Sequence, residues 1–419
     1  MRLSLFVACA PGLEGLLQGE VRRVLGPRKK CEVVAGGVEL TGDVAAVMRL
    51  NLELALASSV RVRIGEVKAK RFDAFARKTS RLPFERFIDP EREYEVRATT
   101  RHSRLYHTGA IAERVAWAVA TRLGRQAPPA NPEAGAEQAS PSVLHARFVD
   151  DVCTLSVDTS GAPLHRRGYR LESARAPLRE DLARALVEVS GWSPGAALVD
   201  PLCGAGTLVI EAALLARRLA PGRSRRFAFM DSPLFDPALF AEIQAKLAAR
   251  ASPCLPVRLV GTDRDPGAIE AARANAERAG VADDVCFAEA SLSDAPSHWP
   301  ALTRESALVA NMPFGQRVSR GQPLGALHQR LGALVAALPE RPRVALLVAD
   351  RKLAYLTGLD LHPAFHTKHG GLSVHAMVGH QTKARAPSVR GQDDGPSSEA
   401  AEAGAARAEG QGASGGGGP

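Results

Sequence analysis

The chain has 419 residues, enough for two or three domains that each bury a core of their own. Hydrophobic residues make up 45% and charged residues 24%, as in a soluble globular protein, and the formal charge of +9 favours a polyanionic partner. The six cysteines are scattered, without a C-x-x-C pair or a His/Cys cluster, which argues against a zinc site or a disulfide framework. We therefore expect a cytoplasmic protein with no metal. The lack of any run of about 18 apolar residues argues against a membrane span.

The N-terminal half alternates between strand and helix patterns. Apolar residues recur at helical spacing in 11–25 and 43–54, and 31–40 has strand patterns, which together indicate a small α+β module over 1–56. The apolar run at the start is too short for a signal peptide and leads directly into the first helix pattern. Further along, the chain predicts strand 60–68, basic helix 71–81, strand 93–99, helix 109–123, a Pro- and Ala-rich loop 126–142 and two strands in 143–158.

From residue 164 the pattern changes to short apolar runs separated by helical stretches. This alternation predicts an α/β domain with a mostly parallel sheet and helices on both faces. The predicted strands are 196–200, 257–261, 284–289, 307–310 and 344–348. Near the end the chain becomes rich in Gly, Ser, Ala and Glu, and we expect a disordered tail over 384–419.

A turn of small residues follows the first of these strands, in the sequence DPLCGAGT (200–207). Gly204 and Gly206 allow a tight turn that places a ligand at the strand ends and over a helix N-terminus. Because the sequence is not G-x-G-x-x-G, we expect a nucleoside cofactor with an amino-acid part rather than a dinucleotide. Asp200 would meet its ammonium and Asp263, at the end of the second strand, its ribose hydroxyls. The alternative is an ordinary strand-to-helix turn with a capping Asp.

The stretch Asn311-Met312-Pro313-Phe314-Gly315 closes the fourth predicted strand. An exocyclic amine such as guanine N2 is a poor nucleophile, because its lone pair is delocalised into the ring. Acceptors aimed at its two hydrogens favour a pyramidal nitrogen, and the Asn311 side-chain oxygen and the Met312 carbonyl can supply them. Phe314 can stack on the base and Pro313 stiffens the turn, so methyl transfer needs positioning more than a strong base. The alternative is an Asn-led turn after an edge strand.

Basic residues gather around one predicted strand and helix of the N-terminal half, over 61–81. A charge run is usually a solvated face, but in a basic protein with a base-amine motif we expect phosphate contacts that position RNA. The residues assigned to RNA are Arg61, Lys68, Lys70, Arg71, Arg77 and Lys78. Two further clusters, at 165–170 and 217–226, carry the same expectation. Trp117 and Trp192 lie in helix patterns and are predicted to be core.

In this order, the motifs resemble those of a known family. The chain is similar to the THUMP-containing bacterial guanine-N2 methyltransferases of large-subunit ribosomal RNA, and more distantly to the THUMP enzymes that methylate tRNA guanine N2. The matching segments are 164–170 (LHRRGYR), 176–180 (APLRE), 190–192 (SGW), 200–207 (DPLCGAGT), 210–213 (IEAA), 261–263 (GTD), 275–276 (NA) and 311–315 (NMPFG).

The resemblance implies a Rossmann-like, S-adenosylmethionine-dependent methyltransferase domain with a mostly parallel seven-stranded sheet, preceded by an α+β ferredoxin-like and THUMP region that binds RNA. It divides the chain into a ferredoxin-like module (1–56), a THUMP domain (57–163), a methyltransferase domain (164–383) and the tail (384–419). It places the cofactor at Asp200, Pro201, Cys203, Gly204, Gly206, Thr207, Asp263, Ser291 and Asn311, with 167–169 bordering the pocket. It places the target base at Asn311, Met312, Pro313 and Phe314.

Three residues depart from the family's pattern. Ribosomal RNA members usually carry Asn-Pro-Pro-Tyr, where this chain has Met312 and Phe314. The Met312 carbonyl remains and Phe314 can still stack, so the chemistry should survive, although x-Pro-Phe-Gly is similar to the tRNA branch. Ser291 stands where many relatives place an Asp that contacts the adenine amine, and its hydroxyl can accept the same hydrogen bond.

The leading hypothesis is therefore methylation of a guanine N2 in RNA, with 23S ribosomal RNA favoured and tRNA as the alternative. An Asn-x-Pro-aromatic motif also serves adenine N6 in DNA, but the basic N-terminal half and the lack of a DNA-reading helix motif argue against that substrate. A third hypothesis is a catalytically silent RNA-binding factor. The intact Asp200, Gly204, Gly206, Asp263 and Asn311 disfavour it.

Overall fold

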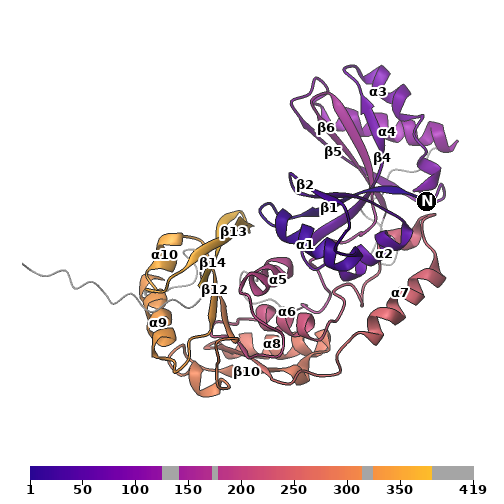
Figure 1. The fold of residues 1–419 in the computed structure, drawn as a ribbon. Helices are drawn as coiled ribbons and strands as arrows, with labels where there is room; N and C mark the ends of the chain where they lie inside the picture. Colours follow the sequence, from indigo (N-terminus) through magenta and orange to yellow (C-terminus); the bar gives the residue numbers. More distant parts are fainter. Residues whose placement is uncertain (125–140, 172–177, 314–323, 380–419) are drawn as a thin grey trace, which may run out of the picture. The chain divides into compact units, whose positions relative to one another are not determined.

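Two seven-stranded β-sheets organise the chain (Figure 1). The computed structural model describes residues 1–124, 141–171, 178–313 and 324–379. The tail expected over 384–419 and nearly all of the loop expected over 126–142 lie outside the described residues. In the described ranges, no helix combines the length and the apolar character that crossing a membrane requires.

The first sheet contains the N-terminal half, in the strand order β2-β3-β1-β4-β7-β6-β5. Its strands are β1 (Leu3–Cys9), β2 (Cys31–Val34), β3 (Gly37–Gly42), β4 (Ala57–Lys68), β5 (Tyr94–Arg101), β6 (Ser142–Val149) and β7 (Val152–Asp158). Neighbouring strands are antiparallel, except that β5 and β6 are parallel. Since β4 pairs with β1 on one side and β7 on the other, the segments 1–56 and 57–163 share one continuous sheet.

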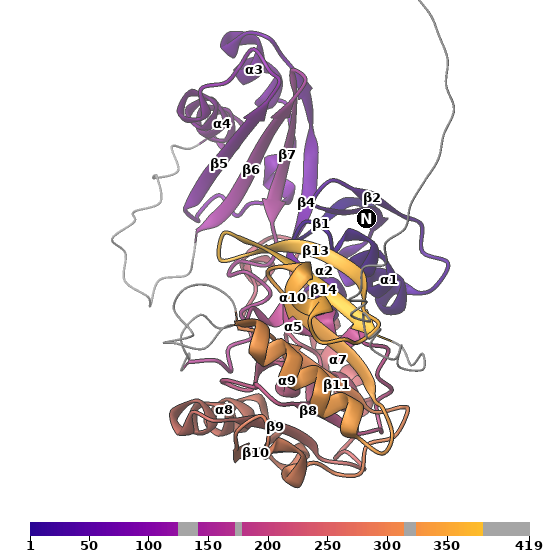
Figure 2. The same ribbon diagram turned by 90° about the vertical axis from the view of Figure 1, so that its left-hand side faces the viewer.

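The helices of this half are α1 (Glu14–Leu25), α2 (Val44–Glu53), α3 (Phe72–Thr79) and α4 (Thr108–Leu123). Figure 2 shows α3 and α4 beside the strands β5, β6 and β7. Helix α4 buries Ile111, Val115 and Val119 against the sheet, but Trp117 is 51% exposed, so the prediction that Trp117 is core was wrong. Trp117 lies two residues after Val115, and at about 100° per residue that turns it to the opposite face. Trp192, by contrast, is buried as predicted.

The second sheet has the strand order β10-β9-β8-β11-β12-β14-β13. Its strands are β8 (Leu198–Asp200), β9 (Leu259–Asp263), β10 (Val285–Glu289), β11 (Ala307–Asn311), β12 (Arg343–Val348), β13 (His362–His369) and β14 (Leu372–Gly379). β8 to β12 are parallel, and β14 is antiparallel to both β12 and β13. The expected strands and the mostly parallel sheet are confirmed. The β13–β14 hairpin was not predicted.

Helices cover both faces of this sheet, as expected. Alternate residues of the central strands enter two different cores, as a sheet buried on both faces requires. Val309 packs into the core that also holds residues of α5, α6 and α8, whereas Leu308 packs with residues of α9 and α10. The helices are α5 (Glu180–Val189), α6 (Thr207–Ala216), α7 (Pro237–Ala249), α8 (Pro266–Ala279), α9 (Leu324–Ala337) and α10 (Arg351–Tyr355). Short 3-10 helices are η1 (Phe84–Arg86), η2 (Ala228–Asp231), η3 (Ala282–Asp284) and η4 (Ala295–His298).

Candidate active site

Three polar side chains end adjacent strands of the second sheet. β9, β8 and β11 lie side by side and end at Asp263, Asp200 and Asn311, respectively. The three strands are parallel, with Val199 of β8 opposite a residue of each neighbour, so their carboxyl ends meet at one edge of the sheet. The fold therefore brings the predicted cofactor acids and the predicted base-binding Asn to the same edge.

The turn from β8 into α6 depends on its two glycines. Gly204 and Gly206 have φ of 52° and 80°, a conformation that side chains with a Cβ disfavour. A Cβ on Gly206 would lie 2.7 Å from the Phe287 ring, whereas a Cβ on Gly204 would have no described atom within 4 Å. Gly206 is thus fixed by packing as well as by conformation, and Gly204 leaves space beside the turn in which a ligand could lie.

Asp263 holds this turn in place. Its Oδ2 accepts a hydrogen bond from the Gly204 amide at 2.9 Å, and its Oδ1 accepts one from the Asp265 amide at 3.0 Å. Each carboxylate oxygen keeps a second lone pair, so Asp263 can still accept ribose hydroxyls. The sequence predicted only the contact with the ribose hydroxyls, not the hydrogen bond that holds the glycine turn.

Asp200 is a buried carboxyl at the end of β8, with 1% of its surface exposed. Its Oδ1 accepts the Leu202 amide at 3.0 Å. Burial raises the pKa of Asp200 to about 8, the Leu202 amide acts in the opposite direction, and the charge of Asp263 raises the pKa further. An ammonium group beside Asp200 would compensate the buried carboxylate.

The side-chain oxygen of Asn311 lacks a hydrogen-bond donor in the part of the chain that the structure describes. This oxygen, Oδ1, is buried. A buried acceptor left unpaired costs stability, which favours an external donor at this position. The adjacent Met312 amide donates to the Leu347 carbonyl of β12 at 3.0 Å, and this bond fixes the backbone whose carbonyl was predicted to face the amine. Pro313 follows it, and Phe314 lies outside the described residues.

The remaining cofactor residues surround the turn. Cys203 is buried, and its amide donates to the Thr262 carbonyl at 3.0 Å. Thr207 begins α6, and the side chain of Asn275, in α8, donates to the Ala205 carbonyl at 3.1 Å. Pro201 lies within the turn. Asn275 was seen in sequence only as part of a matching segment.

Ser291 lies next to Asp263, because the Ala290 amide donates to the Asp263 carbonyl at 2.9 Å. The Ser291 hydroxyl donates to Asp294 Oδ2 at 2.6 Å, and both side chains are exposed. The chain therefore still has a carboxylate beside this loop, three residues beyond the position at which relatives carry their Asp. Sequence reasoning missed Asp294, although a Ser-x-x-Asp spacing is a signal for such a pair.

The basic residues assigned to RNA do not all lie together. Lys68, Lys70 and Arg71 are exposed and consecutive, or nearly so, at the end of β4. Arg77 and Lys78 are exposed on α3, and the Lys78 ammonium donates to the Lys68 carbonyl at 2.9 Å. Arg61 lies seven residues before Lys68, roughly 23 Å along the strand. It is partly buried, and burial lowers its pKa.

Several arginines of the two further basic clusters make contacts within the protein, and the expectation that these clusters contact phosphates stays a prediction. Arg167 is buried and donates to the carbonyls of Leu164 and Ala55, each at 2.6 Å. In the segment 217–226, all the arginines except the exposed Arg218 have partners that the structure describes within the protein. Arg217 contacts the Ser252 and Gly280 carbonyls and Asp284, Arg223 the Ala279 carbonyl, Arg225 the Ala162, Pro163 and Arg166 carbonyls, and Arg226 Asp231. Part of the hydrogen-bonding capacity of these guanidinium groups is therefore used within the protein.

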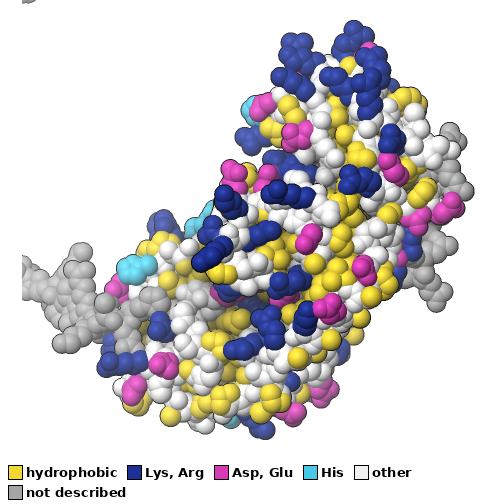
Figure 3. Space-filling model, turned by 45° about the vertical axis from the view of Figure 1, so that its right-hand side comes forward, with side chains coloured by type: hydrophobic (Ala, Val, Ile, Leu, Met, Phe, Trp, Pro, Cys, Tyr) yellow, Lys and Arg dark blue, Asp and Glu magenta, His cyan; other side chains and the backbone are white. Residues whose placement is uncertain are grey.

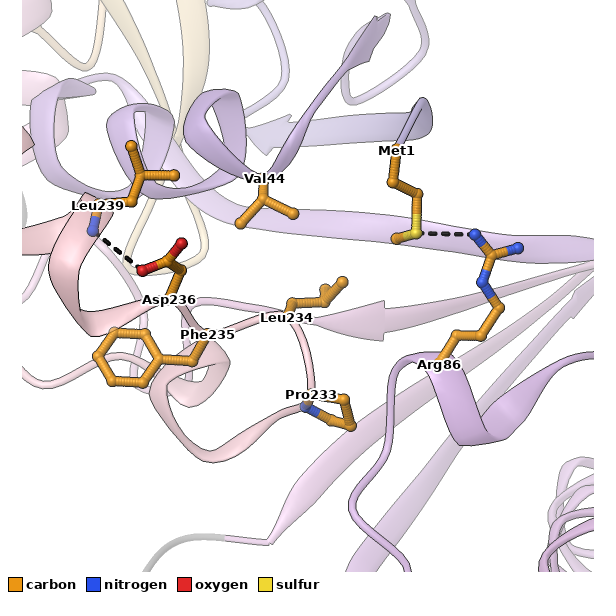
Figure 4. A pocket seen from close by; sticks show the side chains of 8 residues that line it. All are labelled: Met1, Val44, Arg86, Pro233, Leu234, Phe235, Asp236 and Leu239. Carbon is orange, nitrogen blue, oxygen red and sulfur yellow. Dashed lines mark hydrogen bonds between the residues drawn. The ribbon is translucent and has the colours of Figure 1, made fainter.

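A separate pocket of about 430 Å³ shares no residue with the strand-end site (Figure 4). It is lined by Met1, Val44, Arg86, Pro233, Leu234, Phe235, Asp236 and Leu239. Its two charged side chains already have partners, because Asp236 accepts the Leu239 amide at 3.0 Å and Arg86 contacts the Met1 sulfur at 2.7 Å. Across the described ranges, no group of three or more His, Cys, Asp and Glu could hold a metal ion.

Comparisons with known proteins agree with this geometry. A family model described as "RMKL-like, methyltransferase domain" matches residues 167–375, and one described as "RlmL ferredoxin-like domain" matches residues 4–61. The "Putative RNA methyltransferase YpsC" of Bacillus subtilis is 31% identical over 336 residues, which cover 79% of this chain and 84% of that protein. A "Putative RNA methyltransferase" of Synechocystis is 29% identical over 369 residues, covering 88% and 94% of the two chains.

Solved structures share the same fold. The structure of SMU.472, described as a putative methyltransferase complexed with SAH, has a TM-score of 0.80 and 26% identity, covering 91% of this chain and 99% of that one. A structure from Listeria monocytogenes, described as a predicted N6-adenine-specific DNA methylase, has a TM-score of 0.79 and 28% identity, covering 90% and 96%. The fold is that of a methyltransferase.

This chain belongs to the RMKL-like methyltransferase family, with an RlmL-type ferredoxin-like region before the methyltransferase domain. Its cofactor is S-adenosylmethionine, as expected from the sequence. The residues present fit this group, because a Cβ on Gly204 would meet no described atom within 4 Å, Asp200 is a buried carboxyl, and Asp263 keeps free lone pairs for hydroxyl groups. When bound, the cofactor supplies an electrophilic methyl group.

Proposed function

We propose that this protein methylates the exocyclic N2 of a guanine in RNA, and that 23S ribosomal RNA is the favoured substrate. The observation that carries the proposal is the buried Asn311 Oδ1, which has no hydrogen-bond partner among the described residues and lies at the strand edge that also holds Asp200 and Asp263. The names of the relatives from Bacillus subtilis and Synechocystis support RNA as the substrate class. So does the basic surface around Lys68, Lys70 and Arg71.

In this proposal the chain acts by positioning the amine. Asn311 Oδ1 accepts one amine hydrogen and the Met312 carbonyl accepts the other, which turns the nitrogen lone pair towards the methyl group. The hydrogen bond from the Met312 amide to Leu347 keeps that carbonyl in place during the transfer. Phe314 stacks on the base, and no strong base is required, because the amine proton becomes acidic once the nitrogen is methylated.

The division of labour along the chain belongs to the same proposal. Residues 1–56 form the ferredoxin-like module, 57–163 the THUMP domain that binds RNA, and 164–383 the methyltransferase domain. Residues 384–419 form a tail. Asp200, Pro201, Cys203, Gly204, Gly206, Thr207, Asp263 and Ser291 hold the cofactor, with Asp294 beside Ser291 as an added acceptor.

Two alternatives use the same acceptors. A tRNA guanine differs only in the RNA that presents it. Adenine N6 also has two amine hydrogens, and the name of the Listeria monocytogenes protein refers to that position in DNA. The experiment must therefore identify the product base as well as the nucleic acid.

The test uses S-adenosylmethionine with an isotopically labelled methyl group and the purified full chain. Unmodified 23S ribosomal RNA, tRNA and double-stranded DNA are incubated separately, digested to nucleosides and analysed by mass spectrometry. We expect labelled N2-methylguanosine from 23S ribosomal RNA. Label in tRNA alone would transfer the proposal to tRNA, and labelled N6-methyladenine would overturn it. Cofactor binding without label in any substrate would support the silent RNA-binding factor.

A further inference from the structure

Three separate segments of the N-terminal half meet at one residue, Asp151, in the tight turn between β6 and β7. The Ala69 amide, just after β4, donates to the Asp151 carbonyl at 3.0 Å. The Asp151 amide donates to the Ser103 hydroxyl at 3.1 Å, and the Arg104 amide donates to Asp151 Oδ1 at 2.7 Å. These bonds fix the end of β4, the connection between β5 and α4, and the β6–β7 turn side by side.

This junction assembles a basic surface from two stretches that lie about thirty residues apart in sequence. Lys68, Lys70 and Arg71 come from the end of β4 and Arg101 from the end of β5. His102, Arg104, Tyr106 and His107 come from the connection before α4, and all eight are exposed. We call these eight residues the junction surface. Lys70 lies 3.9 Å from Asp151 and Arg71 pairs with Asp73 at 3.0 Å, so part of the positive charge is balanced. Figure 3 shows Lys and Arg side chains gathered at the top of the molecule, where α3 lies.

One large aromatic side chain in this surface, that of Tyr106, is exposed instead of packing into the core. Tyr106 is 64% exposed, while its neighbour Leu105 is buried at 4% and anchors the segment in the core. The Thr100 hydroxyl donates to the Leu105 carbonyl at 3.0 Å, which holds the backbone beside Tyr106. The Tyr106 ring also lies against the His107 ring, with 4.2 Å between the ring centroids. An exposed ring on a firmly held backbone, among cations, has the properties of a stacking platform for a nucleobase.

We propose that the junction surface binds a single-stranded segment of the RNA substrate, with one unpaired base stacked on Tyr106 and the neighbouring phosphates on Lys68, Lys70 and Arg104. Bases inside a duplex cannot offer a free face, so the platform selects unpaired nucleotides. The inference rests on the proposed function, because it takes RNA to be the substrate. It adds a second RNA-binding surface, far along the chain from Asn311, that selects the RNA by its single-stranded character.

The test compares three single-residue variants and one double variant, Lys70→Gln with Arg104→Gln, with the parent, all as the full chain. Tyr106→Ala removes the ring, Tyr106→Phe keeps it, and Trp117→Ala removes another exposed aromatic from α4, whose exposure of 51% makes it a matched control. Fluorescence anisotropy measures binding of a labelled single-stranded RNA and of the corresponding blunt RNA duplex. Circular dichroism and thermal unfolding confirm that each variant is folded.

We expect Tyr106→Ala to weaken binding of the single-stranded RNA by about 5- to 150-fold, the range for loss of one stacked base. Its binding of the duplex should not change, and Tyr106→Phe and Trp117→Ala should bind like the parent. The salt dependence should stay constant in Tyr106→Ala. It should flatten in the double variant Lys70→Gln with Arg104→Gln, by about 0.7 for each phosphate that the protein no longer neutralises.

Equal binding of single-stranded RNA by the parent and Tyr106→Ala would overturn the inference, and so would equal losses in Tyr106→Ala and Trp117→Ala. Failure of the proposed function has a different signature. If the protein binds single-stranded RNA through Tyr106 but forms no N2-methylguanosine, the result would support the junction surface and refute the proposed guanine methylation. If the protein forms N2-methylguanosine but its binding of single-stranded RNA does not depend on Tyr106, the result would support the proposed function and refute the junction surface.

Discussion

Asn311, Asp263 and Asp200 show how the surroundings of a single residue define its role at the strand edge. Asn311 Oδ1 is buried without a partner among the described residues, whereas both oxygens of Asp263 already accept backbone amides. Substitution of Asp263 would therefore disturb the glycine turn as well as the ribose contact. Asn311 is the cleaner probe of chemistry, because its acceptor supports nothing else that the structure describes.

Replacement of Asn311 by Ala should lower the rate of methyl transfer by about 10²-fold or more, the usual effect of deleting a preorganised polar group. Cofactor affinity should be nearly unchanged, since the turn and Asp263 remain intact. Asn311→Asp is the matched control, because a carboxylate keeps the acceptor and should retain more activity than Ala. Single-turnover kinetics and calorimetry measure the two effects. Methylation by Asn311→Ala at the parental rate would refute the mechanism.

Asp200 should make stability depend on pH. Burial raises its pKa from 3.8 to about 8, so the folded state binds the proton more tightly than the unfolded state. The resulting stabilisation is fully present below the unfolded pKa and is lost as the pH rises towards the folded value. Asp200→Asn cannot ionise, and its oxygen can still accept the Leu202 amide.

Urea denaturation without cofactor at about pH 5 and at about pH 8 measures this dependence, because these two values span most of the interval between the unfolded and the folded pKa of Asp200. We expect the free energy of unfolding of Asp200→Asn minus that of the parent to be larger at pH 8 than at pH 5, because only the parent loses stability as the pH rises. A difference that stays constant with pH would show that Asp200 does not hold a proton in the folded state.

At the scale of elements, the turn between β8 and α6 and the turn between β6 and β7 both depend on backbone conformations with positive φ. Gly204 and Gly206 provide them in the first turn, and Asp150 and Asp151, at 50° and 63°, in the second. Asp and Asn tolerate this region better than other residues with a Cβ, especially where the side chain is hydrogen-bonded locally. Each turn is hydrogen-bonded to a segment that is distant in sequence.

The two glycines of the first turn should respond differently to Ala. Gly204→Ala should cost only the conformational penalty, about 1–2 kcal/mol of unfolding free energy. Gly206→Ala should cost the same penalty and about 1–3 kcal/mol more, because its Cβ would lie 2.7 Å from the Phe287 ring. Urea denaturation of the two variants under identical conditions gives the comparison. Equal losses would mean that Phe287 yields without cost.

At the scale of the whole molecule, the Arg167 guanidinium contacts elements that pack against both sheets. Arg167 donates to the Ala55 carbonyl, which lies between α2 and β4, and its Nε lies 3.4 Å from Glu211 Oε1 in α6. Tyr169 also donates to Glu211 Oε1, at 3.2 Å. In the segment expected to border the cofactor pocket, Arg167 thus makes a buried ionic contact with Glu211 and a hydrogen bond to the N-terminal half at Ala55.

Arg167→Met should lower the free energy of unfolding by about 3–5 kcal/mol, because Glu211 would be left buried without its nearest cation. Arg166→Met is the matched control, since the neighbouring Arg166 is exposed and should change stability by no more than about 0.5 kcal/mol. Urea denaturation, followed by near- and far-ultraviolet circular dichroism, measures both. If Arg167→Met loses no more unfolding free energy than Arg166→Met, the Arg167 contacts do not stabilise the protein as predicted.

The sequence by itself determined the features that short segments specify. The strands of the parallel sheet follow from apolar runs, the glycine turn is contiguous over 200–207, and Asn311 ends its strand within one motif. Trp117 and the β13–β14 hairpin were readable too. Helical spacing from Val115 places Trp117 outside the buried face, and the Gly370-Gly371 turn between alternating residues is a hairpin signal. These were errors of interpretation, not limits of the sequence.

Only the tertiary structure decided which charged groups remain free. A guanidinium in the sequence looks the same whether it faces solvent or a carbonyl more than fifty residues away, as Arg225 does at Pro163. Likewise, the Asp151 junction joins the backbones near residues 69, 103 and 151, which no local pattern connects. Hydrogen bonds between distant segments depend on how the chain packs, so the basic clusters could be counted from the sequence but not assigned to protein or to RNA.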